Sequence, residues 1–194
     1  MPIGLPGSGK STYLSRIADI VIVSGDGIRR AMFGDEGIQY TDTWLKALCY
    51  DPSRMSENQK KSACSEVVWT IVDKRIIQLL KSGKSVGYDG INTDETLRRA
   101  AIRRFQPFAD IHGLYFKVDP AVCLERNRNR KRQVEEEWLK GLASHIAIPK
   151  LMEGFQIIDV IDENGAVIQR LDGTSDEDRT GNKDFGKGSM KNDL

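Results

Sequence analysis

The chain has 194 residues, of which 39% are hydrophobic, and its 29 basic and 28 acidic side chains leave a formal net charge of +1. This length accommodates one domain with a full core, and the balanced charge excludes a protein that is basic throughout. No apolar run reaches the ~20 residues of a membrane span, and the first residues lack the pattern of a signal peptide. We therefore expect no membrane partner. The three cysteines have no metal or disulfide spacing, which suits a reducing environment, so we expect a cytoplasmic protein.

The most specific motif lies near the beginning of the chain. Residues 4–12 read Gly-Leu-Pro-Gly-Ser-Gly-Lys-Ser-Thr and fill every fixed position of the phosphate-binding loop G-x-x-x-x-G-K-[ST]. Glycines let backbone N–H groups turn toward a β-phosphate, and the helix that follows adds its N-terminal dipole. Lys10 supplies a cation for the β- and γ-phosphate oxygens, and Ser11 supplies a hydroxyl for Mg²⁺. The predicted ATP contacts in this loop are Gly7, Ser8, Gly9, Lys10, Ser11 and Thr12.

Strand and helix patterns alternate along the chain. The strand before the phosphate loop has only residues 1–3 available, so it is stunted or the chain starts upstream of Met1. We predict helices over residues 11–18, 56–82, 93–105, 119–130 and 135–144, and further strands over residues 20–23, 85–89, 113–118 and 155–161. This order predicts a three-layer α/β fold with a parallel five-stranded sheet over residues 1–172. We expect residues 33–56 to form an acceptor-binding insertion and residues 173–194 to be a polar, disordered tail.

Two carboxylates follow predicted strands. Asp26 comes shortly after the strand at residues 20–23, and Asp89 ends the strand at residues 85–89. Ligands of open α/β sheets bind at the carboxyl ends of the strands. Asp26 is therefore a candidate general base, and Arg29, one helical turn later, a candidate clamp for an acceptor phosphate; the alternative is that Asp26 only caps the helix that carries Arg29. Asp89 is a candidate carboxylate for Mg²⁺ or a candidate contact to the acceptor. The alternative is that Asp89 has no functional role and is only a turn residue at the end of its strand.

Arginines are concentrated in two predicted helices. Arg126 and Arg130 are spaced i, i+4, so on a helix they share a face and could close over ATP as a lid. Their neighbours Arg128, Lys131 and Arg132 are expected to be solvated. The second group is expected to face outward into solvent, with a nucleic-acid track as the alternative; it consists of Arg98, Arg99, Arg103 and Arg104.

Together these features resemble the bacteriophage polynucleotide 5′-kinase family, P-loop kinases of the AAA type, and more loosely the small kinases that include zeta toxins. The resemblance covers residues 3–162 and rests on the phosphate loop, the Asp26-x-x-Arg29 spacing, Tyr-Asp-Gly-Ile-Asn at residues 88–92 and the segment 126–130. It implies a P-loop kinase fold with a helical lid. By position, it implies Lys10 and Ser11 on ATP and Mg²⁺, Asp26 as general base, Arg29 on an acceptor phosphate, Asp89 at the acceptor hydroxyl and Arg130 on the ATP phosphates.

The sequence therefore predicts an ATP- and Mg²⁺-dependent kinase that phosphorylates a hydroxyl, foremost the 5′-hydroxyl of a polynucleotide. One alternative acceptor is a hydroxyl on a modified DNA base, a nucleoside or a sugar-like small molecule. An alternative from another class is an NTP-hydrolysing switch or motor. The acceptor would be a nucleic acid or nucleotide-like in the first reading and a small molecule in the second.

Overall fold

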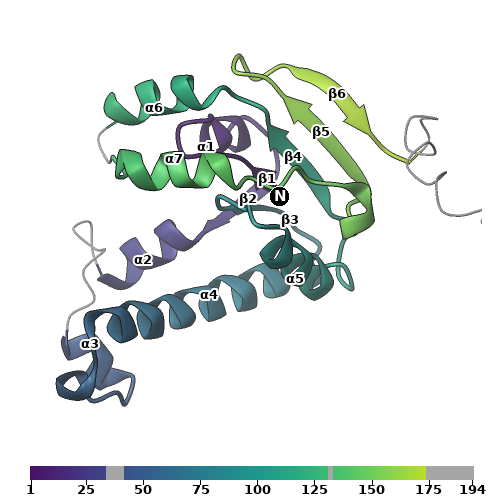
Figure 1. Ribbon diagram of the computed structural model, residues 1–194. Helices are drawn as coiled ribbons and strands as arrows, with labels where there is room; N and C mark the ends of the chain where they lie inside the picture. The colour runs from purple at the N-terminus through teal and green to yellow at the C-terminus, as the bar shows by residue number, and fades with distance from the viewer. Residues whose placement is uncertain (34–41, 131–132, 174–194) are drawn as a thin grey trace, which may run out of the picture.

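The chain folds into strands and helices that alternate along the sequence (Figure 1). The structure is a computed structural model, and it describes residues 1–33, 42–130 and 133–173. The strands are β1 (Pro2–Ile3), β2 (Ile20–Ser24), β3 (Ser85–Asp89), β4 (His112–Phe116), β5 (Ile157–Ile161) and β6 (Val167–Leu171). The α-helices are α1 (Lys10–Leu14), α2 (Gly25–Phe33), α3 (Asp42–Ala47), α4 (Glu57–Lys81), α5 (Glu95–Phe105), α6 (Pro120–Arg128) and α7 (Glu136–Ser144), with 3₁₀ turns η1 (Pro52–Arg54) and η2 (Leu151–Glu153). No helix in the described ranges is long and apolar enough to cross a membrane.

The predicted parallel sheet of five strands is wrong. One sheet has four strands in the order β1-β4-β5-β6, with β6 antiparallel to β5, and a separate sheet pairs β2 with β3 in parallel. The physical reason is β1, which has only two residues, one of them a proline without an N–H to donate. Two hydrogen bonds still hold β1 beside the end of β3, from Gly4 N–H to the Ile91 carbonyl (3.1 Å) and from the Asn92 amide to the Pro2 carbonyl (2.7 Å). The two sheets therefore lie edge to edge.

Helices cover both faces of these sheets. On one face α4 and α5 pack their apolar stripes against the strands, with Val68, Val72 and Ile102 fully buried. On the other face Leu14 of α1 lies against the backbone of Gly87 in β3. The α6 and α7 helices pack on the phosphate loop through a smaller cluster that contains Cys123 and Leu139. The result is the predicted arrangement of three layers, with the loop ends of β1, β2 and β3 at one edge (Figure 1).

Local signals explain where most helices begin. Ser56 accepts a hydrogen bond from the backbone of Gln59, whose side chain accepts one from Ser56 N–H, and this capping box starts α4 as predicted. The α5 helix begins slightly later than the predicted residue 93, because Asp94 caps it by accepting the Leu97 N–H at 2.9 Å. The α1 helix ends at Leu14 instead of residue 18. Of the predicted insertion over residues 33–56, Phe33 ends α2, residues 34–41 lie outside the described ranges, and α3 and η1 follow from residue 42 onward. Of the predicted tail only residue 173 lies within the described ranges.

Candidate functional site

The phosphate loop leaves β1 and turns tightly back against α6. Gly4, Gly7 and Gly9 all have positive φ angles, of 154°, 86° and 96°. At Gly7 a side chain is excluded for a second reason, because its Cβ would lie 2.6 Å from the backbone oxygen of Cys123. Glycine therefore permits both the backbone turn and the close approach of α6. The residues present fit a phosphate cradle of this kind.

The Lys10 side chain is buried at the centre of this loop. Its Nζ donates hydrogen bonds to the carbonyls of Gly4 (2.9 Å) and Leu5 (2.6 Å). Burial lowers the pKa of Lys10 to about 8, an effect that the negative charge of Asp89 opposes and the positive charge of Arg130 strengthens. The charges of Lys10, Asp89 and Arg130 are thus close enough to influence one another. This is the concentration of charge that a triphosphate site requires.

Ser11 and Asp89 meet next to this lysine. The Ser11 hydroxyl donates a hydrogen bond of 2.8 Å to the Asp89 carboxylate. In the described parts of the chain no group of three or more His, Cys, Asp or Glu residues could hold a metal ion. Mg²⁺ does not need one, because it binds through one or two protein oxygens with water and substrate phosphates completing its shell. Ser11 and Asp89 are therefore suitable magnesium ligands.

Asp26 and Arg29 lie on α2, directly beyond the end of β2. Ser24, the last residue of β2, is the strand neighbour of Asp89 in the sheet. Asp26 follows Ser24 by two residues, so it lies near the Ser11–Asp89 pair. The Ser24 hydroxyl accepts the Gly27 N–H at 2.9 Å and so caps this helix itself. Asp26 and Arg29 form an ion pair of 3.5 Å. A carboxylate and a guanidinium thus stand together at the loop edge of the sheets.

The tryptophan that supports Arg29 was not predicted as part of the site. The Arg29 guanidinium lies over the Trp69 ring, 5.9 Å from its centroid, in the range of cation–π contacts. A Cβ on Gly25 would lie 3.1 Å from the Arg29 side chain and 3.3 Å from Trp69, so the glycine makes room for this contact. Nothing in the local pattern around Trp69 links it to Arg29, a residue 40 positions earlier.

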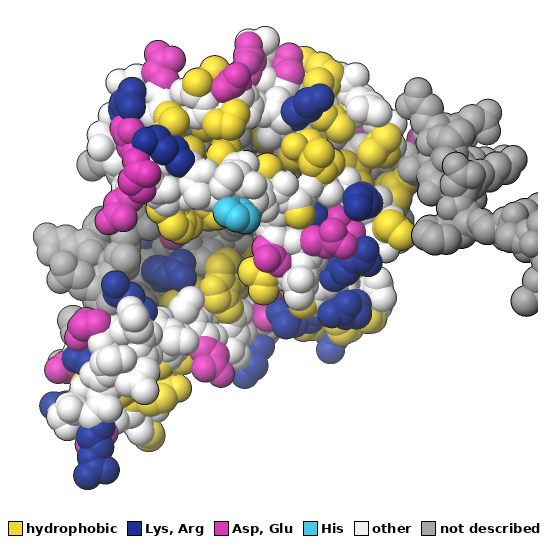
Figure 2. Space-filling view, viewed as in Figure 1, with side chains coloured by type: hydrophobic (Ala, Val, Ile, Leu, Met, Phe, Trp, Pro, Cys, Tyr) yellow, Lys and Arg dark blue, Asp and Glu magenta, His cyan; other side chains and the backbone are white. Residues whose placement is uncertain are grey.

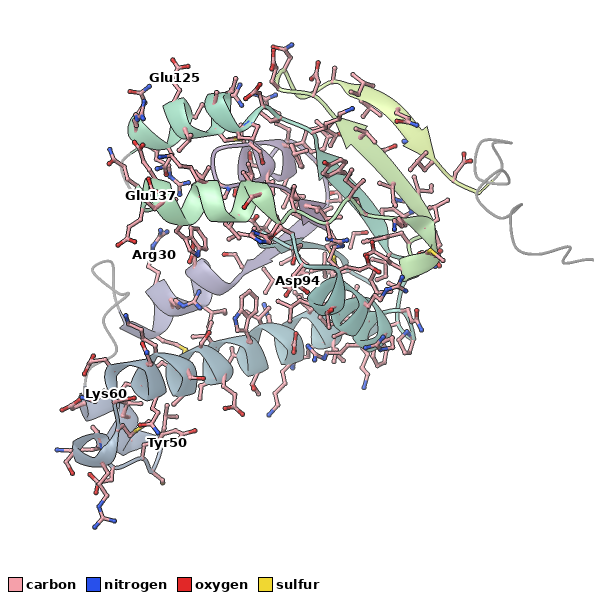
Figure 3. All side chains as sticks on the ribbon, in the orientation of Figure 1. Arg30, Tyr50, Lys60, Asp94, Glu125 and Glu137 are labelled. Carbon is pink, nitrogen blue, oxygen red and sulfur yellow. The ribbon has the colours of Figure 1, made fainter. Side chains whose placement is uncertain are left out.

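The face of the molecule beside α2 is hollowed. Figure 2 shows the hollow between the part that holds α7 and the part that holds α2 and α4. In Figure 3 the Arg30 side chain extends from α2 toward α7, and Asp94 lies at the start of α5 below α7. The helix that carries Asp26 and Arg29 therefore lies at the edge of this hollow.

The predicted pairing of Arg126 with Arg130 on one helix face is wrong. The α6 helix ends at Arg128, so Arg130 lies beyond it. Arg126 donates to the carbonyls of Gly7 (3.5 Å) and Glu163 (2.9 Å), which places it beside the phosphate loop. Both arginines still lie near the predicted ATP site, but they reach it from a helix and from the segment after it. Residues 131–132 lie outside the described residues, and a helical lid is not confirmed.

Thr12 of the phosphate loop is exposed on α1.

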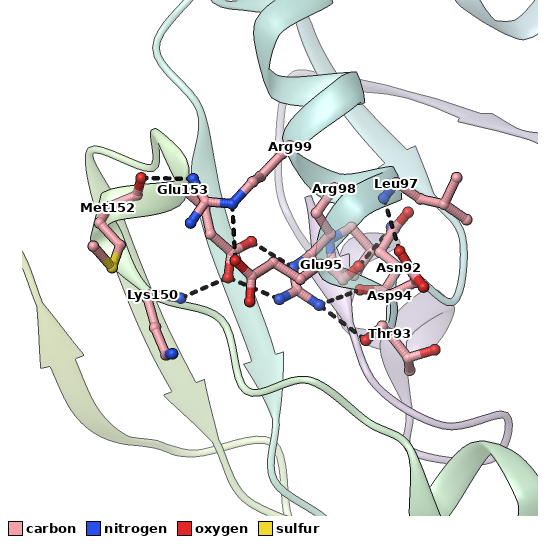
Figure 4. Close-up of polar contacts among 11 residues, drawn as sticks. Asn92, Thr93, Asp94, Glu95, Leu97, Arg98, Arg99, Lys150, Met152 and Glu153 are labelled. Atoms are coloured by element: carbon pink, nitrogen blue, oxygen red, sulfur yellow. Dashed lines mark hydrogen bonds and ion pairs between the residues drawn. The ribbon is translucent and has the colours of Figure 1, made fainter.

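The four arginines of α5 do not form an outward-facing group. Arg98 is 1% exposed and makes two hydrogen bonds with the Glu153 carboxylate, of 2.7 and 2.8 Å (Figure 4). Its remaining nitrogen donates to the carbonyls of Asn92 (3.1 Å) and Thr93 (3.0 Å). Two further arginines also have carboxylate partners, Arg99 with Glu95 and Arg104 with Asp73. The expectation that all four are solvated, and the alternative of a nucleic-acid track, are therefore wrong for Arg98.

The helical period contained a signal for Arg98. Residues 98, 101, 102 and 105 recur with the spacing of one helix face, and the last three are the apolar residues Ala101, Ile102 and Phe105. All four are buried. The position of Arg98 on the apolar stripe of α5 predicts its burial better than its residue type does.

The comparisons with known proteins agree with this geometry. The AAA domain family matches residues 1–148. No curated protein matches the chain. Among solved structures, a protein assigned as a kinase from Chloroflexus aurantiacus J-10-fl has a TM-score of 0.57 at 17% sequence identity, over 83% of this chain and 85% of that chain. A chain of the Pnkp1/Rnl/Hen1 RNA repair complex has a TM-score of 0.56 at 21% identity, over 74% of this chain and only 42% of that one.

A third likeness is weaker. A gluconokinase from Sinorhizobium meliloti 1021 has a TM-score of 0.49 at 15% identity, over 87% of this chain and 81% of that chain. At 17% and 21% identity, the first two likenesses show a common fold and leave the acceptor undetermined. The family match spans the phosphate loop, both strand-end carboxylates and the arginines of α6. The chain therefore belongs to the AAA domain family and has a P-loop kinase-like α/β fold.

Proposed function

We propose that the protein is an ATP-dependent kinase that transfers the γ-phosphoryl group to the 5′-hydroxyl of a polynucleotide. The observation that carries the proposal is the adjacency of two pairs at one sheet edge. Ser11 and Asp89 form the first pair, and Asp26 and Arg29 form the second, one strand away. A site that only hydrolyses nucleotides needs the first pair, whereas the second supplies a base and an anion clamp for an acceptor.

Each residue has a defined task in this reaction. The acceptor O–H gives its proton to the Asp26 carboxylate, the acceptor oxygen bonds to the γ-phosphorus, and the bond from that phosphorus to the β,γ-bridging oxygen breaks to leave ADP. Arg29, whose guanidinium lies over Trp69, would bind a phosphate of the acceptor. Lys10 and Arg130 offset the negative charge of the transferring group. Mg²⁺, when bound to Ser11 and Asp89, neutralises charge on the β- and γ-phosphate oxygens.

A small-molecule acceptor is the second candidate, and the α5 arginines favour it. A long polynucleotide would gain affinity from a row of unpaired cations along its backbone. On α5, the side chains of Arg98, Arg99 and Arg104 are instead engaged by carboxylates. Recognition then depends on the immediate surroundings of Asp26 and Arg29, which a nucleoside or another small phosphorylated alcohol could also satisfy.

The two candidates and the hydrolase alternative are separated by one set of incubations. The protein is mixed with γ-labelled ATP and Mg²⁺ together with a 5′-hydroxyl oligonucleotide, a nucleoside 3′-monophosphate or gluconate, and without acceptor. The proposal predicts labelled oligonucleotide and little label released without acceptor. Labelled gluconate alone would replace the polynucleotide by a sugar-like acceptor. Label released only as inorganic phosphate, at the same rate in every tube, would contradict kinase activity.

A further inference from the structure

A separate pocket of about 360 Å³ lies between α7 and the start of α5. It is lined by Thr93, Asp94, Trp138, Gly141, Leu142 and His145. Four of these residues are spaced i, i+3, i+4 and i+7, so they form one stripe along α7 and its C-terminal cap. None of the residues assigned above to ATP, Mg²⁺ or proton transfer lines it.

The pocket and the phosphate loop lie on opposite sides of α7, so only the width of this helix separates them. Leu139 of α7 is fully buried against Leu5 of the loop and Cys123 of α6. Leu142 belongs both to this cluster and to the pocket wall. A helix is roughly 10 Å across with its side chains, so the pocket is about one helix width from the loop.

The opposite wall is held rigidly. The Thr93 carbonyl accepts hydrogen bonds from Arg98 and from Ala147 N–H, both of 3.0 Å. The Arg98–Glu153 pair behind it is completely buried. The Asp94 carboxylate is oriented by the Leu97 N–H that it accepts. The pocket is therefore preformed, which reduces the entropy lost on binding.

The lining favours a flat aromatic ligand that carries hydrogen-bond donors. Trp138 is 46% exposed, so part of its indole ring is available for stacking. The Nδ1 atom of His145 lies 2.9 Å from both the Gly141 carbonyl and the Ser144 hydroxyl, so contacts with α7 hold this ring nitrogen. The two oxygens of the Asp94 carboxylate supply hydrogen-bond acceptors in the pocket wall. An aromatic face with acceptors beside it suits the ring and the N–H groups of a nucleobase.

We infer that this pocket binds the base of a nucleotide acceptor, an inference that rests on the proposed kinase function. The position supports the acceptor rather than ATP. Thr93 follows Asp89 by four residues, which limits their Cα separation to ~14 Å, and it lies on the β3 side of the phosphate loop, next to the strand that leads to Asp26. Arg126 and Glu163 lie on the opposite side, beside α6 and the β5–β6 turn. The base of the acceptor would stack on Trp138 while its hydroxyl faces Asp26.

Two probes test the inference by calorimetric titration without relying on turnover. One is deoxyadenosine 3′-monophosphate, and the other is the base-free analogue 1,2-dideoxyribose 3-monophosphate. Trp138→Ala should lower the affinity for the base-bearing probe about tenfold, the usual scale for one base–aromatic stack. The affinity for the base-free probe should stay unchanged. Gly141→Leu should act in the same way by filling the pocket, because a Cβ on Gly141 meets nothing within 4 Å and leucine suits a helix. Phe108→Ala, at an aromatic residue 38% exposed outside the pocket, should change neither probe.

The possible failures are distinguishable. If both pocket variants bind the base-bearing probe like the wild type, while the enzyme still phosphorylates it, the base binds elsewhere and the kinase proposal stands. If Trp138→Ala lowers the affinity for ATP and not the affinity for the probe, the pocket binds the adenine of ATP, and the inference is overturned. If the wild type binds neither probe and phosphorylates no acceptor, the proposed function fails and the inference fails with it.

Discussion

The Arg98 guanidinium and the Glu153 carboxylate form a bidentate pair in which neither side chain is exposed. The pair joins α5 to the turn before β5 and fixes the Asn92 and Thr93 carbonyls that follow the Asp89 strand. A structural pair thus supports the segment that connects the candidate magnesium ligand to the pocket beside α7.

Breaking this pair should destabilise the fold. Glu153→Leu leaves the Arg98 charge buried without a partner, which costs about 3–5 kcal/mol of unfolding free energy. Arg98→Met combined with Glu153→Leu should recover most of that loss, because no unpaired charge remains. Urea unfolding of the two single variants and the double variant measures the coupling. Glu136→Ala, which removes the exposed partner of Arg128, is the control and should change stability little. If the double variant loses as much unfolding free energy as the two single variants together, Arg98 and Glu153 do not stabilise the fold as a pair.

Gly7 should tolerate no side chain. In Gly7→Ala, the added Cβ meets the Cys123 carbonyl at 2.6 Å, so the loop or α6 must move and ATP affinity should fall at least ~10-fold. Gly83→Ala is a matched control, because Gly83 has a φ of 74° but open space around its Cβ. It should lose only the ~1–2 kcal/mol of the left-handed conformation and bind ATP normally. Equal ATP affinity in the two variants would show that the contact with Cys123 does not matter.

The lowered pKa of Lys10 predicts proton uptake when ATP binds. Without a ligand the pKa is about 8, and bound phosphate favours the ammonium form and must raise it. Below pH ~8 Lys10 is already charged before ATP binds. Above pH ~8 Lys10 takes up a proton when ATP binds, so the affinity for ATP falls as the pH rises, by at most about tenfold per pH unit. Calorimetry at about pH 8.5 in two buffers of different ionisation enthalpy measures the protons bound. Lys10→Met should lose this uptake, and an unchanged uptake in that variant would assign it to another group.

Asp26 and Arg29 should affect different kinetic constants. Asp26→Asn should lower kcat by ~10²-fold or more, the usual contribution of a positioned base, with little change in ATP affinity. Arg29→Ala should mainly raise the acceptor KM, and Arg29→Lys should not restore it fully, because a lysine lacks the planar group that lies over Trp69. Steady-state kinetics over both substrates separate these effects. A collapse of ATP affinity in Asp26→Asn would move that residue to the metal site.

The sequence predicted the elements and the phosphate loop well because these depend on local patterns. The β3 strand was predicted over the residues it occupies, and α4 begins at the predicted place, directly after Ser56. The adjacency of Ser11 and Asp89 followed from a general rule, that parallel strands end at one edge of a sheet. Predictions failed where distant segments decide the outcome. The five-stranded sheet is divided at the short β1 strand, and Arg98 is buried because Glu153, 55 residues later, neutralises it.

The most direct test of the proposed kinase activity follows the γ-phosphoryl group during the reaction. With γ-labelled ATP, Mg²⁺ and a 5′-hydroxyl oligonucleotide, we expect one labelled oligonucleotide for each ADP formed. In Asp26→Asn both should fall together, by ~10²-fold or more. ADP formation without labelled oligonucleotide, at a rate that the Asp26 substitution leaves unchanged, would contradict the assignment of Asp26 and of the kinase reaction.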